Sequence, residues 1–570
     1  MARVRPAGES GIGRRGIRRG ISREGHARAC LTAGTALPYR APVNEAVPRC
    51  GTSEGGDDAD RESGRFHIVV DEAKIRARER YLATPPRETP TQRPNIVIIL
   101  ADDLGKTDIS LYGGRVATPR IDTLGHEGAT CSEGYITSPI CSPSRAGLMT
   151  GRYQQRFGHE IQPHERYPRN RLEYYLFKYF LATDDFRVAD LIAFPRFEDI
   201  VQQGLPLSEV TLAEVLRRQG YQTAIMGKWH LGSSPDRIPI RRGFDYHYGF
   251  YEAHTLYADP HDPDIVNQRH DDFADRHIWS LGRQGNCALR RNDQVVDEKV
   301  YLTQKITAES IRWLEAHRDG PFFLYVPFSA PHTPFQVPRQ YYDRFADVSD
   351  PIHRVYYGMI AALDDGVGAI MDTLARLGLD DRTLVFFLSD NGGATYTGAT
   401  DNAPLRGGKF TNFEGGINIP FLVRYRGTIP AGAACPHPVS ALDVFATAVD
   451  LAGADLPTDR PYDGVSLLPF LTGQTMAAPH EALFWRSEYH KAIRQGDWKL
   501  VKDEMSGRTV LFDLATDKSE RRNLAPVHPD VVRDLEAALT RWENEMVSPL
   551  WPRVMDFRFV DGEEVYFFPL

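Results

Sequence analysis

The amino-acid sequence predicts a doubly wound α/β fold followed by a smaller antiparallel sheet with one covering helix. Continuous apolar runs at residues 95–100, 322–326 and 383–388 are typical of strands buried on both faces of a parallel sheet. A helical pattern precedes each of the last two runs, so helices and strands alternate along the chain. Beyond residue 483 the pattern changes to short strands with tight turns and a helix at 536–546, which indicates an antiparallel α+β unit.

The length of 570 residues exceeds one ordinary hydrophobic core, so we expect more than one domain. We predict a basic, disordered extension and linker at residues 1–93, a large α/β domain at 94–474 and a small α+β domain at 475–570. Within the first of these ranges, the pattern between residues 66 and 84 predicts a short strand and a helix.

Charge and hydropathy exclude several classes of partner. A formal net charge of −8 does not indicate nucleic acid binding. No apolar run approaches the ~18 residues of a membrane span, and no apolar stretch of ~7–15 residues follows the arginine pairs at 14–15 and 18–19. We therefore expect a cytoplasmic protein without a membrane partner. Six irregularly spaced cysteines give neither a disulfide framework nor a CxxC metal site, and the oligomeric state stays open.

Oxygen-bearing side chains follow two of the predicted strands. Asp102 and Asp103 follow the first strand, and Asp390 and Asn391 follow the strand at 383–388. The carboxyl ends of parallel strands are where open α/β sheets bind ligands. Three carboxylates and one amide oxygen suit Ca²⁺ or Mg²⁺, whereas each aspartate alone is equally compatible with a solvated acidic turn.

The stretch around Cys141 predicts a loop that leads into a short helix. Ser142 suits the N-cap, Pro143 the first helical position and Gly151 the helix end. Cys141 would then precede a helix N-terminus, where free N–H groups and the helix dipole favour an anion, and Arg145 adds a positive charge. The stretch therefore predicts a site where an anionic substrate is bound and attacked. The alternative is a capped surface helix beside a buried thiol.

Further candidates for anion binding follow in chain order. Lys228 and His230 come after a predicted strand at 221–226, and if that strand continues, they lie on one face because side chains alternate. His332 follows the strand at 322–326, and Lys409 lies in a glycine-rich segment. A lysine beside a histidine can hold an anion and move a proton, although each residue alone is as compatible with a structural role.

An aromatic segment at residues 160–205 interrupts the α/β pattern. It is rich in tyrosine, phenylalanine and arginine and reads as an insertion near the site. We interpret it either as a segment that shapes substrate access or as a set of surface aromatic residues.

Taken together, these segments resemble the type I sulfatases, which depend on formylglycine and belong to the alkaline-phosphatase-like superfamily. The run from Cys141 to Arg152 resembles the family signature. The resemblance covers about residues 94–546, and the other matching blocks follow in the family's order, at residues 95–105, 227–232, 330–332, 390–393, 409–416, 492–501 and 511–525.

This resemblance implies an alkaline-phosphatase-like fold with a mixed sheet and the hydrolysis of sulfate esters. It implies that a formylglycine-generating enzyme oxidises Cys141 to formylglycine, whose hydrate is the nucleophile. It also implies a bound divalent cation, Ca²⁺ with Mg²⁺ as the alternative, whose ligands would be Asp102, Asp103, Asp390, Asn391 and position 141.

The resemblance also implies roles for the remaining candidates. Arg145 would orient the hydrate, and Lys228, Lys409 and His332 would neutralise charge on the sulfate oxygens. His332 or Lys409 would protonate the leaving alcohol. By analogy, His230 would help to take the proton from the second hydroxyl group, and His254 would contact the sulfated group.

Two alternatives within this fold stay open. A phosphonate monoester or phosphodiester hydrolase can use the same Cys-x-Pro-x-Arg signature, although the Gly-Lys-Trp-His-Leu-Gly block at 227–232 favours sulfate. A non-catalytic sulfoglycan-binding protein would have lost at least one site group, and all the expected groups are present. For the enzyme, we expect a sulfated carbohydrate or an aryl sulfate as substrate.

Overall fold

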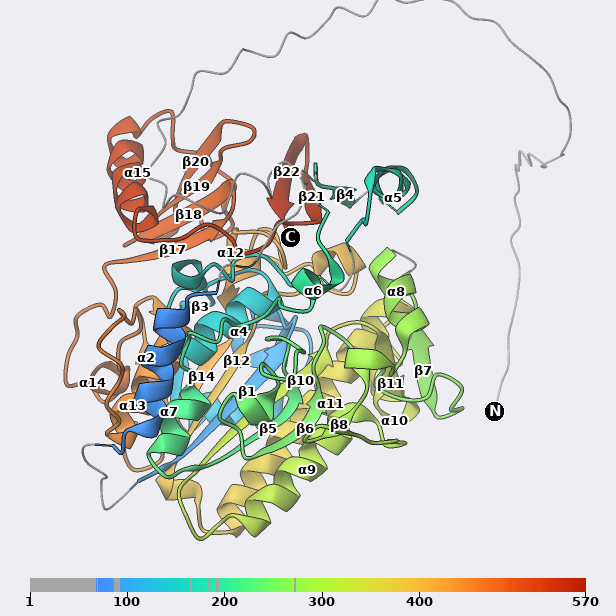
Figure 1. Cartoon of the computed structure of the whole chain (residues 1–570), viewed down its shortest axis with the longest axis vertical. Coiled ribbons are helices and arrows are strands. Elements are labelled where there is room, and N and C mark those ends of the chain that lie inside the picture. Colours follow the sequence, from blue (N-terminus) through green and yellow to red (C-terminus); the bar gives the residue numbers. More distant parts are fainter. Residues whose placement is uncertain are drawn as a thin grey trace, which may run out of the picture. The chain divides into compact units, whose positions relative to one another are not determined.

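The protein is described by a computed structural model that covers residues 68, 70–86, 93–164, 167–181, 185–190, 194–270 and 273–570. Its largest sheet has the strand order β15-β2-β14-β12-β1-β10-β5-β6-β8-β9 (Figure 1). Five central strands run parallel: β12 (Thr383–Ser389), β1 (Asn95–Asp102), β10 (Phe322–Pro331), β5 (Gln222–Lys228) and β6 (Tyr246–Phe250).

Antiparallel strands on both sides of this parallel centre make the sheet mixed. On one side, β14 (Phe421–Arg424) runs antiparallel to β12 and is followed by β2 (Ala129–Cys131) and β15 (Ala433–Cys435). On the other side, β8 (Arg290–Arg291) runs antiparallel to β6 and pairs with β9 (Gln294–Val295). The predicted mixed α/β class is therefore confirmed.

Strand β1 shows why the fold is doubly wound. All eight of its residues are buried, and alternate side chains point to opposite faces of the sheet. Ile96 and Ile98 belong to the core beneath α4 (Cys141–Thr150), α7 (Leu212–Arg218) and α13 (Leu442–Ala452). Val97 and Ile99 belong to the core beneath α3 (Pro119–His126), α9 (Leu302–Ala316) and α11 (Pro351–Arg376).

Several elements extend beyond their predicted bounds. Strand β10 continues to Pro331 instead of ending at 326. Helix α11 begins at Pro351, where Asp350 caps it by accepting hydrogen bonds from the backbone N–H groups of Ile352 and His353. Helix α7 begins with a capping box formed by Thr211 and Glu214.

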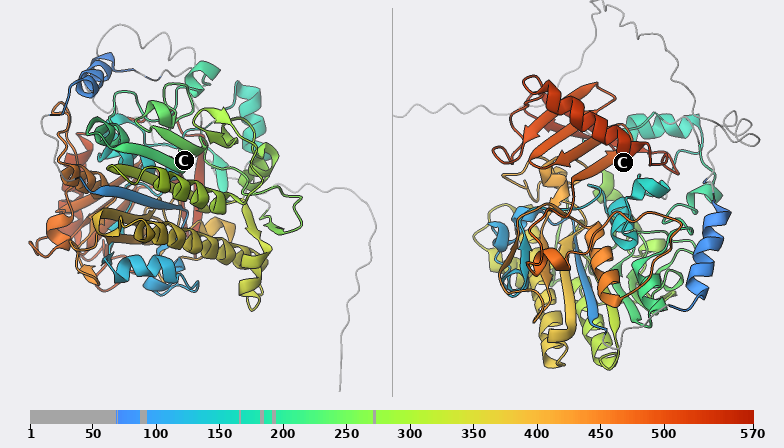
Figure 2. Two further views of the ribbon diagram at one scale, coloured as in Figure 1. Left: turned by 90° about the horizontal axis from the view of Figure 1, so that it is seen from below. Right: turned by 90° about the vertical axis from the view of Figure 1, so that its left-hand side faces the viewer.

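The predicted C-terminal sheet is present as four antiparallel strands (Figure 2): β17 (Ala482–Ser487), β18 (His490–Gln495), β19 (Trp498–Asp503) and β20 (Arg508–Asp513). Helix α15 (Pro529–Glu543) covers one face, where Leu535 and Leu539 pack on Leu500. The helix begins seven residues before its predicted start, with Pro529 at its first position. The domain boundary near residue 475 stays a prediction.

A third sheet was not predicted. It has the order β22-β21-β4 and joins the aromatic segment to the end of the chain. Strand β4 (Phe186–Val188) pairs with β21 (Met555–Asp561), which pairs with β22 (Glu564–Pro569). Two short strands that are more than 360 residues apart give no local signal of their pairing.

The range predicted as an extension contains one helix, α2 (Glu72–Ala83). Arg78 forms an ion pair with Glu214 of α7, and the Tyr81 hydroxyl donates to the carbonyl of Asp455 at 2.8 Å. The predicted disorder of residues 1–62 lies outside the described residues, and so does most of the strand expected at 66–70. Among the helices described, none has the length and apolar character needed to cross a bilayer.

A buried ion cluster connects the C-terminal sheet to the large sheet. The ammonium group of Lys499, on β19, lies 2.8 Å from carboxylate oxygens of both Glu414 and Glu520, and all three side chains are buried. Glu414 begins α12 (Glu414–Ile417), five residues after Lys409. This cluster therefore fixes the segment that carries one of the candidate site residues.

We expect Lys499→Met to lower the free energy of unfolding by about 3–5 kcal/mol, because it leaves two buried carboxylates without a cation. Chemical denaturation measures this change. Lys502→Met on the same strand is the matched control, since its partly exposed pair with Glu536 is worth less than about 1 kcal/mol. Equal losses in the two variants would contradict the role given to Lys499.

Candidate functional site

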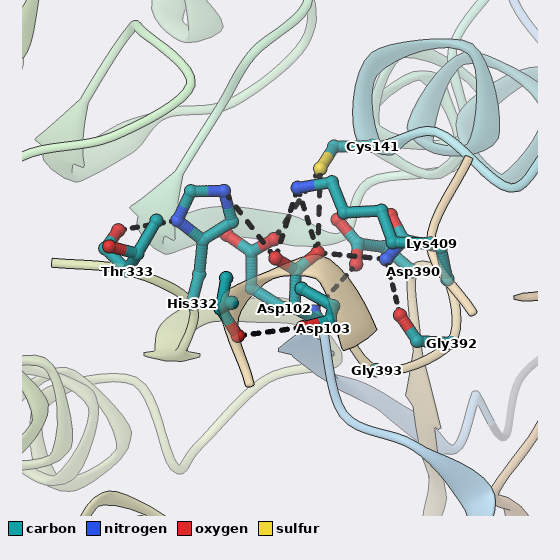
Figure 3. Close-up of polar contacts among 12 residues, drawn as sticks. Asp102, Asp103, Cys141, His332, Thr333, Asp390, Gly392, Gly393 and Lys409 are labelled. Atoms are coloured by element: carbon teal, nitrogen blue, oxygen red, sulfur yellow. Dashed lines mark hydrogen bonds and ion pairs between the residues drawn. The ribbon is translucent and has the colours of Figure 1, made fainter. Parts of the chain in front are cut away.

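Three neighbouring strands of the large sheet end at one place and bring buried polar side chains together (Figure 3). Asp102 is the last residue of β1, Asp390 follows β12, and His332 follows β10. One ligand atom from each of Asp102, Asp103, His332 and Cys141 lies within 4.8 Å of the others. These four residues and Asp390 are buried, so the site is a compact group of charged side chains away from solvent.

Asp103 is central to this group. The backbone N–H of Asp103 donates to Oδ1 of Asp390 at 3.2 Å, and Nδ2 of Asn391 donates to Oδ1 of Asp103 at 2.8 Å. Although burial opposes ionisation, the positive charge of Lys409 lowers the pKa of Asp103. The structure thus places all four predicted oxygen ligands side by side.

The donor set fits a hard divalent cation. Asp102, Asp103 and Asp390 supply buried carboxylates, which are costly to bury without a compensating charge. Oδ1 of Asn391 is buried and has no hydrogen-bond partner among the described residues, as expected for an oxygen reserved for a ligand. His332 also belongs to this group of candidate ligand atoms, whereas the sequence predicted it as a substrate contact and a possible proton donor.

The helix at Cys141 differs from the prediction. Helix α4 begins at Cys141 with Ile140 as N-cap, so the prediction of Ser142 as N-cap and Pro143 as first helical residue was wrong. Ser142 makes tertiary hydrogen bonds instead, and Gly151 ends the helix in a left-handed conformation as predicted. Sγ of Cys141 lies 3.6 Å from Oδ1 of Asp102, and burial raises the pKa of the thiol, so that it is uncharged at neutral pH.

Arg145 lies entirely inside the protein. Its Nε and Nη2 donate to the same oxygen of Asp390 at 2.9 and 2.7 Å, and its Nη1 donates to the carbonyl of Lys228 at 3.1 Å. Burial disfavours its charge, but Asp390 and Asp102 raise the pKa of the guanidinium. Arg145 is therefore a fixed positive charge that ties α4 to the ends of β12 and β5.

Both lysines predicted as anion contacts reach the aspartate pair. Lys228 Nζ donates to Asp102 Oδ2 at 2.6 Å, and Lys409 Nζ donates to Asp103 Oδ2 at 3.0 Å. Despite burial, the carboxylate of Asp103 raises the pKa of Lys409 well above its ordinary value. His332 Nε2 lies 3.6 Å from Asp103, and burial together with Lys409 lowers the pKa of the imidazole well below its usual range.

His230 lies in the site, but not because it continues a strand, as the sequence predicted. Strand β5 ends at Lys228, and His230 has a positive φ of 55°, so strand alternation does not set its direction. Both ring nitrogens are buried without a hydrogen-bond partner among the described residues. Burial, Lys228 and Arg145 lower its pKa well below the ordinary value, which leaves a neutral imidazole able to accept a proton.

His254 lines a cavity together with His332 and Lys409. Burial and His277 lower its pKa to about 3, so the ring is neutral near pH 7. Its Nε2 has no hydrogen-bond partner among the residues described. The ring thus offers a neutral polar atom close to the two candidate anion contacts.

Two serines of the Cys141 segment have positioning roles that sequence reasoning missed. The Ser142 hydroxyl donates to the carbonyl of His230 at 2.6 Å and lies 2.8 Å from Nε2 of His159. The Ser144 hydroxyl donates to the carbonyl of Asp390. Together they connect α4 to the loops after β5 and β12. The sequence shows that Ser142 and Ser144 lie next to Cys141, but it does not show which carbonyl groups their hydroxyls would contact.

Gly392 permits the close backbone approach that positions Lys409. A Cβ atom at Gly392 would lie 1.8 Å from the carbonyl oxygen of Gly415, a distance that no side chain tolerates. The next residue, Gly393, accepts a hydrogen bond from the backbone N–H of Lys409 at 3.0 Å. Glycine at 392 therefore lets the lysine segment pack directly against the end of β12.

The arrangement as a whole suits the binding of a cation and a tetrahedral anion at one point. Lys228, Lys409 and His332 each lie within 3.6 Å of the Asp102–Asp103 pair, and Sγ of Cys141 lies within 3.9 Å of the same pair. His230 adds a neutral imidazole to this buried group.

Comparison with known proteins agrees with this geometry. The sulfatase family model matches residues 94–454, and a model described as N-sulphoglucosamine sulphohydrolase, C-terminal, matches residues 408–545. Steryl-sulfatase from Rattus norvegicus is 30% identical over 548 residues, covering 79% of this chain and 89% of the relative. N-acetylgalactosamine-6-sulfatase from Mus musculus is 32% identical over 447 residues, covering 76% of this chain and 77% of the relative.

Two solved structures share the fold of this chain. Ps i-CgsB has a TM-score of 0.68 and 30% identity, covering 81% of this chain and 95% of its own. The phosphonate monoester hydrolase of Agrobacterium radiobacter shares the fold, with a TM-score of 0.55 and 22% identity, covering 80% and 96%.

We expect Ca²⁺ added to metal-stripped protein to stabilise it by about 2.7 kcal/mol when free Ca²⁺ reaches about 100 times its Kd. Thermal unfolding with and without Ca²⁺ measures the shift. Asp102→Asn and Asp390→Asn should each reduce it, because each removes a carboxylate from the cluster. Asp443→Asn, a buried aspartate paired with His480 elsewhere, is the control and should keep it. A wild-type protein indifferent to Ca²⁺ would contradict the cation site.

Proposed function

Because this chain belongs to the sulfatase family and is a sulfuric ester hydrolase, we propose that position 141, converted from cysteine to formylglycine, supplies the attacking hydroxyl group. The observation that carries this proposal is the placement of Cys141. Its Sγ lies 3.6 Å from Asp102 and 3.9 Å from Asp103, the two carboxylates that also contact Lys228 and Lys409. A formylglycine-generating enzyme is the partner that the conversion requires.

The proposed cation is Ca²⁺, with Mg²⁺ as the alternative. Asp102, Asp103, Asp390 and Asn391 would hold it, together with position 141, since oxygen ligands of this kind suit hard cations. Such a cation polarises a sulfate oxygen and lowers the pKa of the attacking hydroxyl group. The unpartnered Oδ1 of Asn391 and the three buried carboxylates support this assignment.

Lys228, Lys409 and His332 bind the sulfate group in the proposed mechanism. Their positive or hydrogen-bonding groups neutralise charge that develops on the sulfate oxygens as the S–O bond to the alcohol breaks. Nδ1 of His332 faces the carbonyl of Thr333, which only accepts, so the single proton of a neutral ring lies on Nδ1, and Nε2 would donate to a sulfate oxygen only in the protonated ring. Lys409, which Asp103 keeps protonated, is therefore the favoured proton donor to the leaving alcohol.

Arg145 and His230 complete the proposed mechanism. Arg145 keeps its charge and orients the hydrate at position 141 through its place on the same helix. His230 accepts the proton of the second hydroxyl group, which regenerates the aldehyde and releases inorganic sulfate. Its neutral ring and two unpartnered nitrogens support this role as a base.

We propose a sulfated carbohydrate or an aryl sulfate as substrate, with His254 contacting the sulfated group. Relatives bear names of both kinds, arylsulfatase D from Homo sapiens and N-acetylgalactosamine-6-sulfatase, and Ps i-CgsB was crystallised with k-i-k-neocarrahexaose. The likeness to the phosphonate monoester hydrolase concerns the fold alone.

We expect Cys141→Ala to lower the turnover of 4-nitrophenyl sulfate by ~10³-fold or more, because it removes the attacking group. Steady-state kinetics measures this, and Cys287→Ala is the matched control with unchanged turnover. In protein made with the converting enzyme, the peptide that contains residue 141 should be about 18 Da lighter than its cysteine form, as aldehyde-for-thiol replacement requires.

Two results would refute the proposal. Full activity with an unmodified cysteine at 141 would exclude the aldehyde hydrate. Faster turnover of 4-nitrophenyl phosphate esters than of the sulfate would assign the site to phosphoryl chemistry instead.

A further inference from the structure

A cavity of about 270 Å³ opens directly beside the proposed sulfate position. Lys409, His332 and His254 line its inner end (Figure 3 shows the first two). An ester whose sulfate group is bound by Lys409 and His332 would extend its alcohol part into this space. The chemistry of the remaining walls therefore bears on which alcohols fit.

Most of the remaining wall is apolar. The rings of Phe186, Tyr396 and Phe410 pack against one another, with centroid separations of 5.4 to 5.9 Å. The other apolar lining residues are Phe177, Val188, Ile278, Val554, Met555 and Leu570. We call the space enclosed by these residues the aromatic cavity.

Two parts of the chain far apart in sequence build this wall. Val188 of β4 lies opposite Met555 of β21 in the small third sheet. Helix α8 (Phe273–Leu281) supplies Ile278. Phe177, Phe186 and Val188 of the aromatic segment thus form one side of the cavity together with Met555 of β21, whereas Tyr175 and Tyr179 are exposed on the surface.

The aromatic cavity has little charge for a polysulfated chain to meet. Among its described lining residues, Lys409 is the only lysine or arginine. Burial lowers the pKa of His164 to about 4 and that of His254 to about 3, so both rings are neutral at pH 7. Glu252 would repel a second sulfate group. Polar side chains (Gln162, His164, His277 and Thr333) form a minor part of the lining, and a planar apolar ring would contact the larger, aromatic part.

We propose that the aromatic cavity binds the alcohol part of the substrate and selects an uncharged aryl group of about two fused rings over a saccharide. An engineered cavity of about 150 Å³ holds one benzene ring, so about 270 Å³ suits a bicyclic group. This inference rests on the proposed function, because the sulfate position defines the inner end of the cavity.

The test measures binding apart from catalysis, because aryl esters are intrinsically more reactive than sugar esters. Isothermal titration of Cys141→Ala protein gives Kd values for 2-naphthyl sulfate, glucose 6-sulfate and inorganic sulfate. We expect 2-naphthyl sulfate to bind at least about tenfold more tightly than the other two, because it alone buries apolar surface. Tighter binding of glucose 6-sulfate would overturn the inference.

Matched variants locate the effect. We add Val188→Phe or Val554→Phe to the Cys141→Ala protein. Because each phenylalanine fills the aromatic cavity, 2-naphthyl sulfate should then bind no more tightly than inorganic sulfate, whose Kd should stay unchanged. Ile200→Phe, in a neighbouring cavity on the His230 side, is the control and should change neither value. Unchanged 2-naphthyl binding in both valine variants would overturn the inference. If 2-naphthyl sulfate binds as expected but unmutated protein hydrolyses no sulfate ester, the proposed function fails and the cavity assignment stands.

A second inference rests on a separate pair of cysteines. Cys131 on β2 and Cys435 on β15 are direct neighbours in the register of two parallel strands. Both thiols are free and buried. Neighbouring strands lie about 4.8 Å apart, which is within the Cα separation that a disulfide accepts.

We infer that Cys131 and Cys435 form an intramolecular disulfide under oxidising conditions. The two thiols lose two protons and two electrons to form the S–S bond, while a small-molecule disulfide such as glutathione disulfide is reduced to two thiols. Because β15 is the edge strand of the large sheet, the bond would fasten this edge to its neighbour. It would also close a loop of about 300 residues in the unfolded chain, which favours the folded state.

Equilibration with glutathione disulfide, followed by peptide mapping without reduction, tests this inference. We expect a linked peptide pair containing Cys131 and Cys435 and a melting temperature several degrees above that of the reduced protein. Cys435→Ser should abolish both effects, and Cys287→Ser should keep both. Separate alkylation of Cys131 and Cys435 after equilibration would overturn the inference, and mapping distinguishes this pair from Cys30 and Cys50.

Discussion

The carboxylates of Asp102, Asp103 and Asp390 are buried side by side. The cationic side chains around them compensate their charge. Burial and the neighbouring Asp102 raise the pKa of Asp390, which expresses the cost of placing these groups together. Lys228, Arg145 and Lys409 pair with Asp102, Asp390 and Asp103, so each carboxylate has a cationic partner. In the proposed mechanism these side chains are already in position before a sulfate ester and a cation bind.

Tertiary contacts with helix α4, with Gly392 and with the buried cluster around Lys499 hold these charged side chains in place. Helix α4 lies against the strand ends through Arg145, Ser142 and Ser144, and each of these bonds joins the helix to a different backbone segment or carboxylate. The segment that carries Lys409 is fixed on one side by Gly392 and on the other by the buried cluster around Lys499. The C-terminal sheet thus contributes to the site without supplying a side chain that touches the proposed substrate.

The choice of alcohol can change while the reaction stays the same if the groups that bind the sulfate and the groups that contact the alcohol lie in different parts of the structure. In this chain the charged groups lie at the strand ends, whereas the aromatic cavity is built from β4, β21 and α8 outside the large sheet. Changes such as Val188→Phe can therefore alter the choice of alcohol without disturbing the carboxylates. This separation follows from the fold, since loops and added strands vary more freely than a buried parallel sheet.

The sequence by itself determined the buried strands, the order of helices and strands, the C-terminal sheet and the candidate residues at the strand ends, because these depend on local apolar patterns and short motifs. It did not determine that Ser142 bonds to His230 instead of capping α4, that His230 turns through a positive φ, or that Phe186 lies beside Phe410. Those features depend on contacts between residues tens to hundreds of positions apart. Only the folded chain decides them, because local patterns carry no information about which distant partner a side chain will meet.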